Sequence, residues 1–106
     1  MELRLGDASA NSYLAIAGML AAALLGIQHK TEPPEPLVGY GYDVSRSAKL
    51  PQTLGEALDA LEADAEFAAL LGEPFVKTFL SYKRDEIERF NTWITDWEFH
   101  EYTYHI

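Results

Sequence analysis

The stretch from residue 14 to residue 27, LAIAGMLAAALLGI, restricts the fold of this 106-residue chain more than any other feature. It contains no charged side chain, and on a helix its large apolar residues would point in nearly every direction. A helix that is apolar all round has to be enclosed on all sides. The rest of so short a chain can hardly do this, so we expect the helix to pack partly on a surface that this chain does not supply.

The apolar stretch suits a protein core better than a membrane or an export signal. Fourteen residues rise about 21 Å as a helix, whereas the hydrocarbon core of a bilayer is about 30 Å thick. The residues from Met1 to Asp7 are of mixed charge, whereas a secretory signal needs a positive start. We expect a buried helix from Ser9 or Asn11, both good capping residues, to about Lys30. Small residues on it form a ridge that another backbone can approach: Gly18, Ala22 and Gly26.

The charge balance narrows the range of partners. Acidic residues outnumber basic ones by 17 to 8, and residues 51–106 alone carry a net charge of −8. Such an acidic surface repels phosphate backbones and anionic lipids, so neither a nucleic acid nor a membrane is expected as a partner. The absence of cysteine excludes disulfides, thiolate metal sites and a thiol nucleophile. Because it also suits a reducing compartment, we expect a cytoplasmic protein.

The second half of the chain has clear helix signals. It follows residues 31–50, whose prolines predict a long extended crossing loop. Thr53 and Glu56 have the spacing of a capping box, in which each side chain satisfies a free backbone group at a helix start. Apolar residues then recur at the spacing of an amphipathic helix. Asp64 is expected to cap a further short helix that runs to Leu71.

The longest helix is expected after Gly72, with Pro74 as its first residue. Residues at alternating steps of four and three form a mostly apolar seam for packing on another helix: Val76, Leu80, Lys83, Ile87, Phe90, Ile94 and Trp97. Thr95 and Glu98 have the spacing of a second capping box, so we expect a break near residues 94–95.

The end of the chain is rich in aromatic residues, with five of the thirteen in the last fourteen positions. Trp and Tyr are typical interface anchors, so this end is expected to dock on its own core or into a neighbouring subunit. The sequence as a whole predicts one mainly α domain over residues 1–106, with a short strand remnant at the N-terminus and the extended loop at 31–50.

Motifs for generic chemistry are few. His100 and His105 lie five positions apart, about 140° round a helix, whereas the helical zinc motif needs two histidines four apart. We expect no zinc site there, and we find no glycine-rich phosphate loop. Glu2 and Arg4 would face the same way on a strand, where they could hold a cation and an anionic group of one substrate. The alternative is an exposed pair of charges at a strand end.

Four passages, read in order, carry a resemblance over essentially the whole chain. ELRLGDASANSYLAIAGMLAAALLGI is similar to an E-x-R…D-x-x-A-N-P-Y-L-A strand-to-helix passage, with Ser12 in place of the proline. KTEPPEP is similar to a proline-rich crossing. LPQTLGEALDALEAD is similar to an L-P-x-S-L-x-E-A-L stretch, and TDWEFHEYTYHI to a W-E-x-x-x-Y ending. Together the passages resemble the C-terminal part of the glutamine synthetases and their γ-glutamyl-amine ligase relatives.

The resemblance implies the helical C-terminal segment of an α+β ligase that joins ammonia or another amine to the γ-carboxyl of glutamate, using ATP through a γ-glutamyl phosphate. It implies that Glu2 ligates one of two divalent metals, Mg²⁺ or Mn²⁺, and that Arg4 binds the phosphate or glutamate side of the reacting complex. Tyr42 falls near a tyrosine that some bacterial members carry as an adenylylation site, although its neighbours differ from that pattern. The alternative for Tyr42 is an aromatic contact within the loop.

Two functions follow as hypotheses. In the first, the chain is part of such a ligase, and alone it is inactive and binds neither ATP nor metal, because the family's other ligands lie upstream of the passage with Glu2. In the second, it is a stand-alone acidic helical interaction module derived from that fold. Both predict a homo-oligomer formed through residues 14–27 and the aromatic C-terminus, and the first adds the remainder of the synthetase as a partner. The sequence does not identify the amine.

Overall fold

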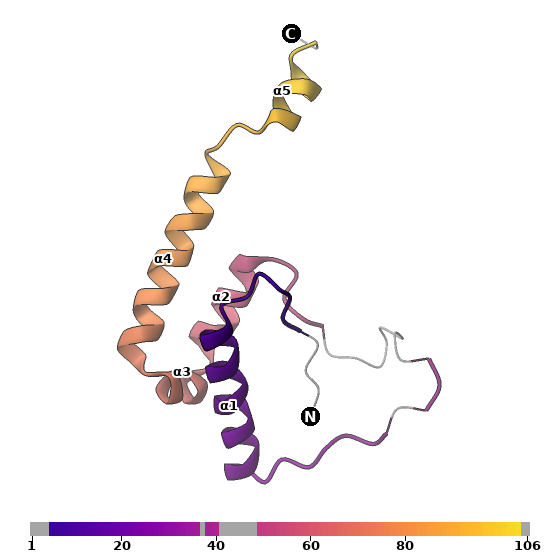
Figure 1. The fold of residues 1–106 in the computed structure, drawn as a ribbon, viewed down its shortest axis with the longest axis vertical. Helices are drawn as coiled ribbons and strands as arrows, with labels where there is room; N and C mark the ends of the chain where they lie inside the picture. The colour runs from indigo at the N-terminus through magenta and orange to yellow at the C-terminus, as the bar shows by residue number, and fades with distance from the viewer. Residues whose placement is uncertain (1–4, 37, 41–48, 105–106) are drawn as a thin grey trace.

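The structure, a computed structural model, describes residues 5–36, 38–40 and 49–104. Within these ranges it contains five helices and no strand, so the prediction of a mainly α fold is confirmed. The helices follow one another along the chain (Figure 1) as α1 (Ser12–Gln28), α2 (Leu54–Ala63), α3 (Ala65–Leu71), α4 (Glu73–Asn91) and α5 (Asp96–Tyr102). The expected strand remnant at residues 1–4 lies outside the described residues. The described part of 31–50 has neither helix nor strand, and its role as an extended crossing stays a prediction.

Both ends of α1 are fixed by local hydrogen bonds. The side-chain oxygen of Asn11 accepts from the backbone N–H groups of Tyr13 and Leu14, at 3.1 and 3.2 Å, and so caps the helix start. At the other end Lys30 has a φ of 51°, and the N–H of Thr31 reaches back to a carbonyl in the last turn. This left-handed termination ends the helix at Gln28, two residues before the predicted end.

The two predicted capping boxes have different outcomes. At α5 the box is complete, because the N–H of Thr95 donates to the Glu98 carboxylate at 2.7 Å and the N–H of Glu98 donates to the Thr95 hydroxyl at 3.3 Å. At α2 the Thr53 hydroxyl accepts from the N–H of Glu56 at 3.1 Å, as expected. The Glu56 carboxylate, however, accepts from the N–H of Gln52 at 2.7 Å instead of from Thr53. The α2 box is therefore only half formed.

The junction between α3 and α4 depends on one glycine. Asp64 caps α3 through the N–H of Phe67 at 3.0 Å, as predicted. Gly72 then has a φ of 94°, a backbone conformation that residues with a Cβ rarely adopt, and it turns the chain into α4. The first residue of α4 is Glu73, so the prediction that placed Pro74 first was wrong by one position. Pro74 still lies in the first turn, where its missing N–H leaves no helical hydrogen bond unmade.

The core is small and lies between α2, α3 and α4. Leu58 of α2 and Val76 and Leu80 of α4 are buried, and a ring of partly buried residues packs against them: Leu61, Ala68, Leu71, Phe79 and Ile87. The seam predicted along α4 is therefore buried only in its first half. Farther along, α4 extends beyond α2 and α3 (Figure 1), and Ile94 after its end is 77% exposed.

The described chain is elongated. It measures 60 × 42 × 24 Å, and its radius of gyration is 18.4 Å, compared with about 13 Å for a compact chain of 100 residues. Figure 1 shows the reason, since α4 leads away from the cluster of helices and α5 lies at its far end. α1 contacts α3, whereas α5 contacts no other helix of the described part. None of the helices in the described part is long and apolar enough to cross a membrane.

Candidate interaction surface

The face of α1 that contacts α3 is lined by small residues. Ala21 is the one residue of α1 that is buried, and a Cβ added to Gly18 would lie 3.7 Å from the ring of Phe67 on α3. A Cβ added to Gly26 would meet nothing within 4 Å. The predicted ridge of small residues is thus used at Gly18 and not at Gly26. A contact of 2.9 Å between Nε2 of His29, just after α1, and a carboxylate oxygen of Glu66 adds a second link to α3.

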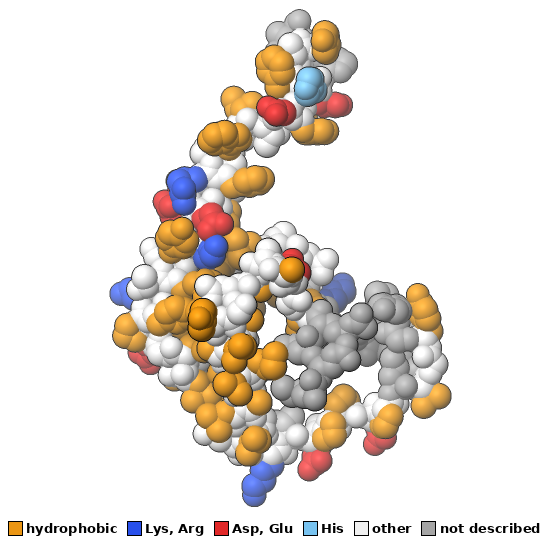
Figure 2. All heavy atoms as spheres, viewed as in Figure 1, with side chains coloured by type: hydrophobic (Ala, Val, Ile, Leu, Met, Phe, Trp, Pro, Cys, Tyr) orange, Lys and Arg blue, Asp and Glu red, His pale blue; other side chains and the backbone are white. Residues whose placement is uncertain are grey.

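The opposite side of α1 is apolar and uncovered. We call it the outer face of α1, and its residues are Tyr13, Ile16, Leu20, Ala23, Leu24 and Ile27. Tyr13 is 86% exposed, Leu20 65% and Ile27 74%. Figure 2 shows apolar side chains gathered over this helix. As expected from the sequence, the rest of the described chain does not enclose it.

An apolar pocket is lined by residues of α1, α2, α3 and α4. It has a volume of about 340 Å³ and is lined by Leu14, Ala17, Gly18, Leu61, Phe67, Leu71, Phe75 and Phe79. Phe75 and Phe79 stack with ring centroids 6.0 Å apart. The lining offers no polar side chain that could orient a substrate, so the pocket suits the packing of apolar groups and not a reaction.

The C-terminal segment offers a second exposed apolar surface. Its aromatic side chains are all exposed: Trp93, Trp97, Phe99, Tyr102 and Tyr104. The rings of Trp97 and Tyr102 meet edge to face at 6.1 Å, which orders the segment locally. Because α5 touches no other helix of the described part, docking on the chain's own core is not seen there. Docking into a neighbouring subunit stays a prediction.

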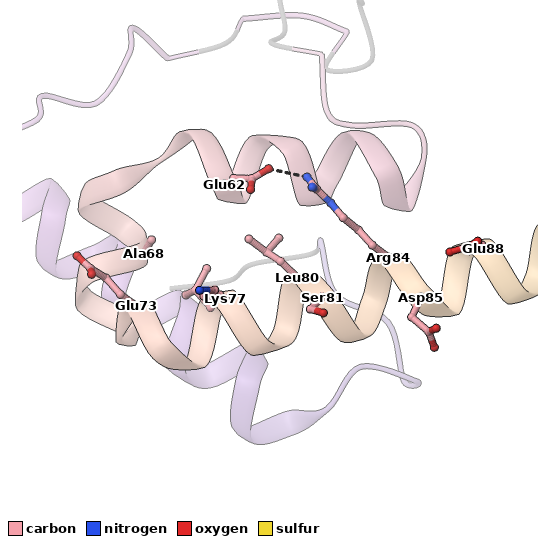
Figure 3. Close-up of a pocket in the computed structure, with 10 residues that line it drawn as sticks. Glu62, Ala68, Glu73, Lys77, Leu80, Ser81, Arg84, Asp85 and Glu88 are labelled. Atoms are coloured by element: carbon pink, nitrogen blue, oxygen red, sulfur yellow. Dashed lines mark hydrogen bonds and ion pairs between the residues drawn. The ribbon is translucent and has the colours of Figure 1, made fainter.

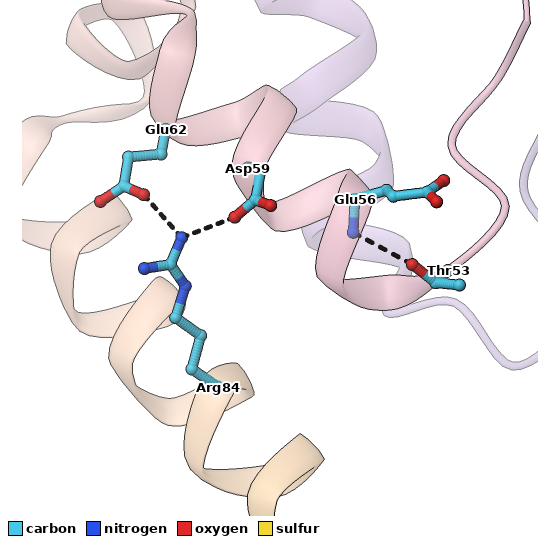
Figure 4. Close-up of polar contacts among 5 residues, drawn as sticks. All are labelled: Thr53, Glu56, Asp59, Glu62 and Arg84. Atoms are coloured by element: carbon cyan, nitrogen blue, oxygen red, sulfur yellow. Dashed lines mark hydrogen bonds and ion pairs between the residues drawn. The ribbon is translucent and has the colours of Figure 1, made fainter.

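An open polar groove of about 740 Å³ runs between α2 and α4 (Figure 3). Its main cation is Arg84, whose guanidinium bridges Asp59 at 2.9 Å and Glu62 at 2.6 Å, as Figure 4 shows. Lys77 is the other cation of the lining, among the carboxylates of Glu62, Glu73, Asp85 and Glu88. With Arg84 already paired and acids in excess, the groove does not suit an anionic substrate such as a nucleotide.

Metal-ligating and titratable groups are sparse in the part of the chain that the structure describes. That part contains no group of three or more His, Asp or Glu side chains placed to hold a metal ion. His100 is exposed on α5. Before α1, the hydroxyl and N–H of Ser9 donate to Asp7 at 2.6 and 2.8 Å and lower the pKa of that carboxyl.

The sequence-predicted site residues Glu2, Arg4 and Tyr42 lie outside the described residues, as does His105. Their roles therefore stay predictions. Three contacts were missed by the sequence reasoning: the bridge made by Arg84, the packing of Phe67 against Gly18, and the contact between His29 and Glu66. All three join elements that are distant in sequence, and no local spacing signals them.

Comparison with known proteins gives one family. The sequence pattern of the family described as "Glutamine synthetase, catalytic domain" matches residues 1–102. The chain is 38% identical to a glutamine synthetase of Archaeoglobus fulgidus, over 96% of this chain and 22% of that protein. It is 38% identical to a gamma-glutamylethanolamide synthetase of Streptomyces coelicolor, over 92% and 21%. It is also 38% identical to a glutamate–methylamine ligase of Methyloversatilis universalis, over 96% and 24%. The chain thus spans about a quarter of the length of these relatives.

Proposed function

Because this chain belongs to the glutamine synthetase catalytic domain family, we propose that it serves as the C-terminal helical part of an ATP-dependent glutamate–amine ligase. The observation that carries the proposal is the match over residues 1–102, which includes the passage with Glu2 and Arg4. We assign no amine. Relatives named for ammonia-, ethanolamine- and methylamine-derived products are equally similar to the chain, each at 38% identity.

In this proposal Glu2 and Arg4 are the chain's contribution to the chemistry. A carboxylate is a hard oxygen ligand that suits Mg²⁺ or Mn²⁺, and a fixed guanidinium stabilises charge on a phosphoryl group during transfer. The other metal ligands and the ATP contacts come, in this proposal, from the remainder of a synthetase. The isolated 106-residue chain is therefore expected to be inactive, and a γ-glutamyl product formed by it with ATP, metal, glutamate and amines would contradict this.

A chimera tests the proposed roles directly. Residues 1–102 would replace the matching segment of the Archaeoglobus fulgidus glutamine synthetase, and glutamate- and ammonia-dependent phosphate release from ATP would be measured. We expect an active chimera in which Glu2→Gln or Arg4→Ala lowers kcat by about 100-fold or more. Glu32→Gln, in the exposed stretch after α1, is the matched control and should leave the rate unchanged. A chimera that assembles normally but is inert, or that tolerates Glu2→Gln, would contradict the proposal.

We further propose that the chain associates with copies of itself through residues 14–27 and the aromatic C-terminal segment. The uncovered outer face of α1 and the exposed aromatic side chains support this. Each large apolar side chain left in water forgoes about 1.5–3 kcal/mol of burial. The same exposed surfaces would serve the alternative function, a stand-alone interaction module. An inert chimera together with specific capture of the 106-residue chain by a defined partner would favour that alternative.

A further inference from the structure

The turn before α1 is held by hydrogen bonds and not by burial. Residues 5–17 are all exposed, so packing does not fix the direction in which the chain enters the helix. The Asp7 carboxylate accepts from the N–H of Ser9 at 2.8 Å and from its hydroxyl at 2.6 Å. The backbone carbonyl of Asp7 also accepts from the N–H of Ala10 at 3.3 Å. Asp7 is therefore the acceptor in all three of these hydrogen bonds.

The turn leads directly into the start of α1. Asn11 follows Ala10 in the chain and caps the helix through the N–H groups of Tyr13 and Leu14. α1 in its turn packs on α3. A short polar side chain that bonds the backbone two residues later is a common way to fix a turn. The hydrogen bonds that begin at Asp7 therefore connect the N-terminal passage to the helical part of the chain.

The residues to which we assign the chemistry come just before this turn. Arg4 precedes Asp7 by three residues and Glu2 by five. Because a chain spans at most about 3.6 Å per residue, Arg4 begins within about 11 Å of Asp7. Groups at a reacting centre have to be held to within about 0.5 Å, and a displacement of about 1 Å can cost about 100-fold in rate. A change in this turn is therefore close enough to displace both groups.

We infer that Asp7 is a positioning residue, whose hydrogen bonds fix the turn through which the passage with Glu2 and Arg4 joins α1. Asp7 acts through this passage and does not touch the substrate. The inference rests on the proposed function, in which Glu2 and Arg4 contact the metal and the phosphoryl group. It adds a residue of the described structure to a proposal that otherwise depends on sequence.

The chimera described above tests this role by kinetics. Asp7→Ala removes the side-chain acceptor and should lower kcat about tenfold. It should also raise the Mg²⁺ concentration for half-maximal rate by about threefold or more, because a displaced Glu2 is a poorer metal ligand. A loss of folded protein would lower the rate without changing this concentration. Asp7→Asn keeps an acceptor oxygen for the Ser9 groups and should restore both values. Glu32→Ala, an exposed acid beyond the other end of α1, is the control.

A distance measurement on the purified 106-residue chain tests the turn without any enzyme activity. Spin labels would be attached at Leu5→Cys and Gln28→Cys, which are exposed positions in a chain without cysteine. The labelled chain would be diluted with unlabelled chain, so that distances between copies do not contribute. Asp7→Ala should broaden the distribution of label distances by about twofold, because the turn loses the two side-chain hydrogen bonds from Ser9. Asp7→Asn should leave the width unchanged.

The outcomes separate this inference from the proposed function. A chimera that is impaired by Glu2→Gln but unaffected by Asp7→Ala overturns the positioning role and leaves the proposed function standing. An unchanged distance distribution in Asp7→Ala overturns it as well, and so does an Asp7→Asn chimera as slow as Asp7→Ala. A chimera that tolerates Glu2→Gln contradicts the proposed function itself.

Discussion

α1 and α4 are similar in length, at 17 and 19 residues, but they are used in opposite ways. α1 is the more apolar helix, yet Ala21 is its one buried residue, because apolar side chains face all directions and α3 covers only one side. α4 is far more polar, yet Val76 and Leu80 are buried, because its apolar residues share the face that meets α2 and α3. The contrast teaches that the arrangement of apolar residues, and not their number, decides what a short chain can bury.

The largest expected effect is at the core position Leu58, which is 2% exposed. Leu58→Ala should lower the free energy of unfolding by about 2–5 kcal/mol, because it leaves a cavity against α4. Leu20→Ala on the outer face of α1 is the matched control and should cost much less at concentrations where the chain is monomeric. Urea unfolding followed by circular dichroism compares the two. Equal losses would contradict the difference drawn between α1 and the core.

The next largest expected change in stability comes from substituting two glycines of α1, Gly18 and Gly26, one at a time. Gly18→Leu should cost about 1–3 kcal/mol, because carbons beyond its Cβ run into the ring of Phe67 on α3. A Cβ added at Gly26 meets nothing within 4 Å, so Gly26→Leu should stabilise the helix by a few tenths to about 1 kcal/mol. Thermal unfolding of both variants measures the difference. If both were destabilising, α1 would be covered on more sides than the structure shows.

The N-cap threonines of α2 and α5 allow the core to be compared with the C-terminal segment, which projects away from it. Thr53→Ala should lower the free energy of unfolding by about 1 kcal/mol, because α2 is part of the core. Thr95→Ala breaks a complete capping box but should reduce only the local helicity of α5, which touches no other helix of the described part. Amide hydrogen exchange resolves the two regions. A global loss of protection after Thr95→Ala would show that α5 is coupled to the core.

The smallest effect is pH-dependent and confined to the turn before α1. Hydrogen bonds from Ser9 lower the pKa of Asp7 below its usual 3.8, so the folded turn favours the ionised carboxyl. The contribution of this turn is present above the usual pKa and is lost as the pH falls through the lowered value. The amide proton of Ser9, followed by NMR during acidification, should report a transition below 3.8, and Asp7→Ala should abolish it. A transition above 3.8 would contradict the assignment.

The helix boundaries were largely predictable because caps are local. Asn11, Asp64 and the Thr95–Glu98 box all act within three residues of their partners, so their spacing in the sequence is their geometry. The errors were also local. The left-handed conformation of Lys30 sets the end of α1, which was predicted two residues too late. The carboxylate of Glu56 accepts a hydrogen bond from the backbone N–H of Gln52 and not from that of Thr53. The family was predictable from four passages in order, and the match over residues 1–102 confirms it.

Of the candidate sites, one depends on the sequence alone and the others needed the structure. The interpretation of Glu2 and Arg4 depends on sequence alone, since neither lies among the described residues. The interaction surface needed the structure, because the sequence placed apolar residues all round α1 without indicating which side α3 covers. The same limit applied to Arg84, whose partners Asp59 and Glu62 lie on another helix.

By itself the sequence determined the helices, their caps and the family, because each of these depends on residues that are near one another in the chain or on motifs in order. Tertiary structure alone decided which apolar residues are buried. The described helices leave many large apolar side chains exposed. The packing of α3 on α1 and of α2 on α4 decides which ones are covered. The outer face of α1 is what that selection leaves exposed.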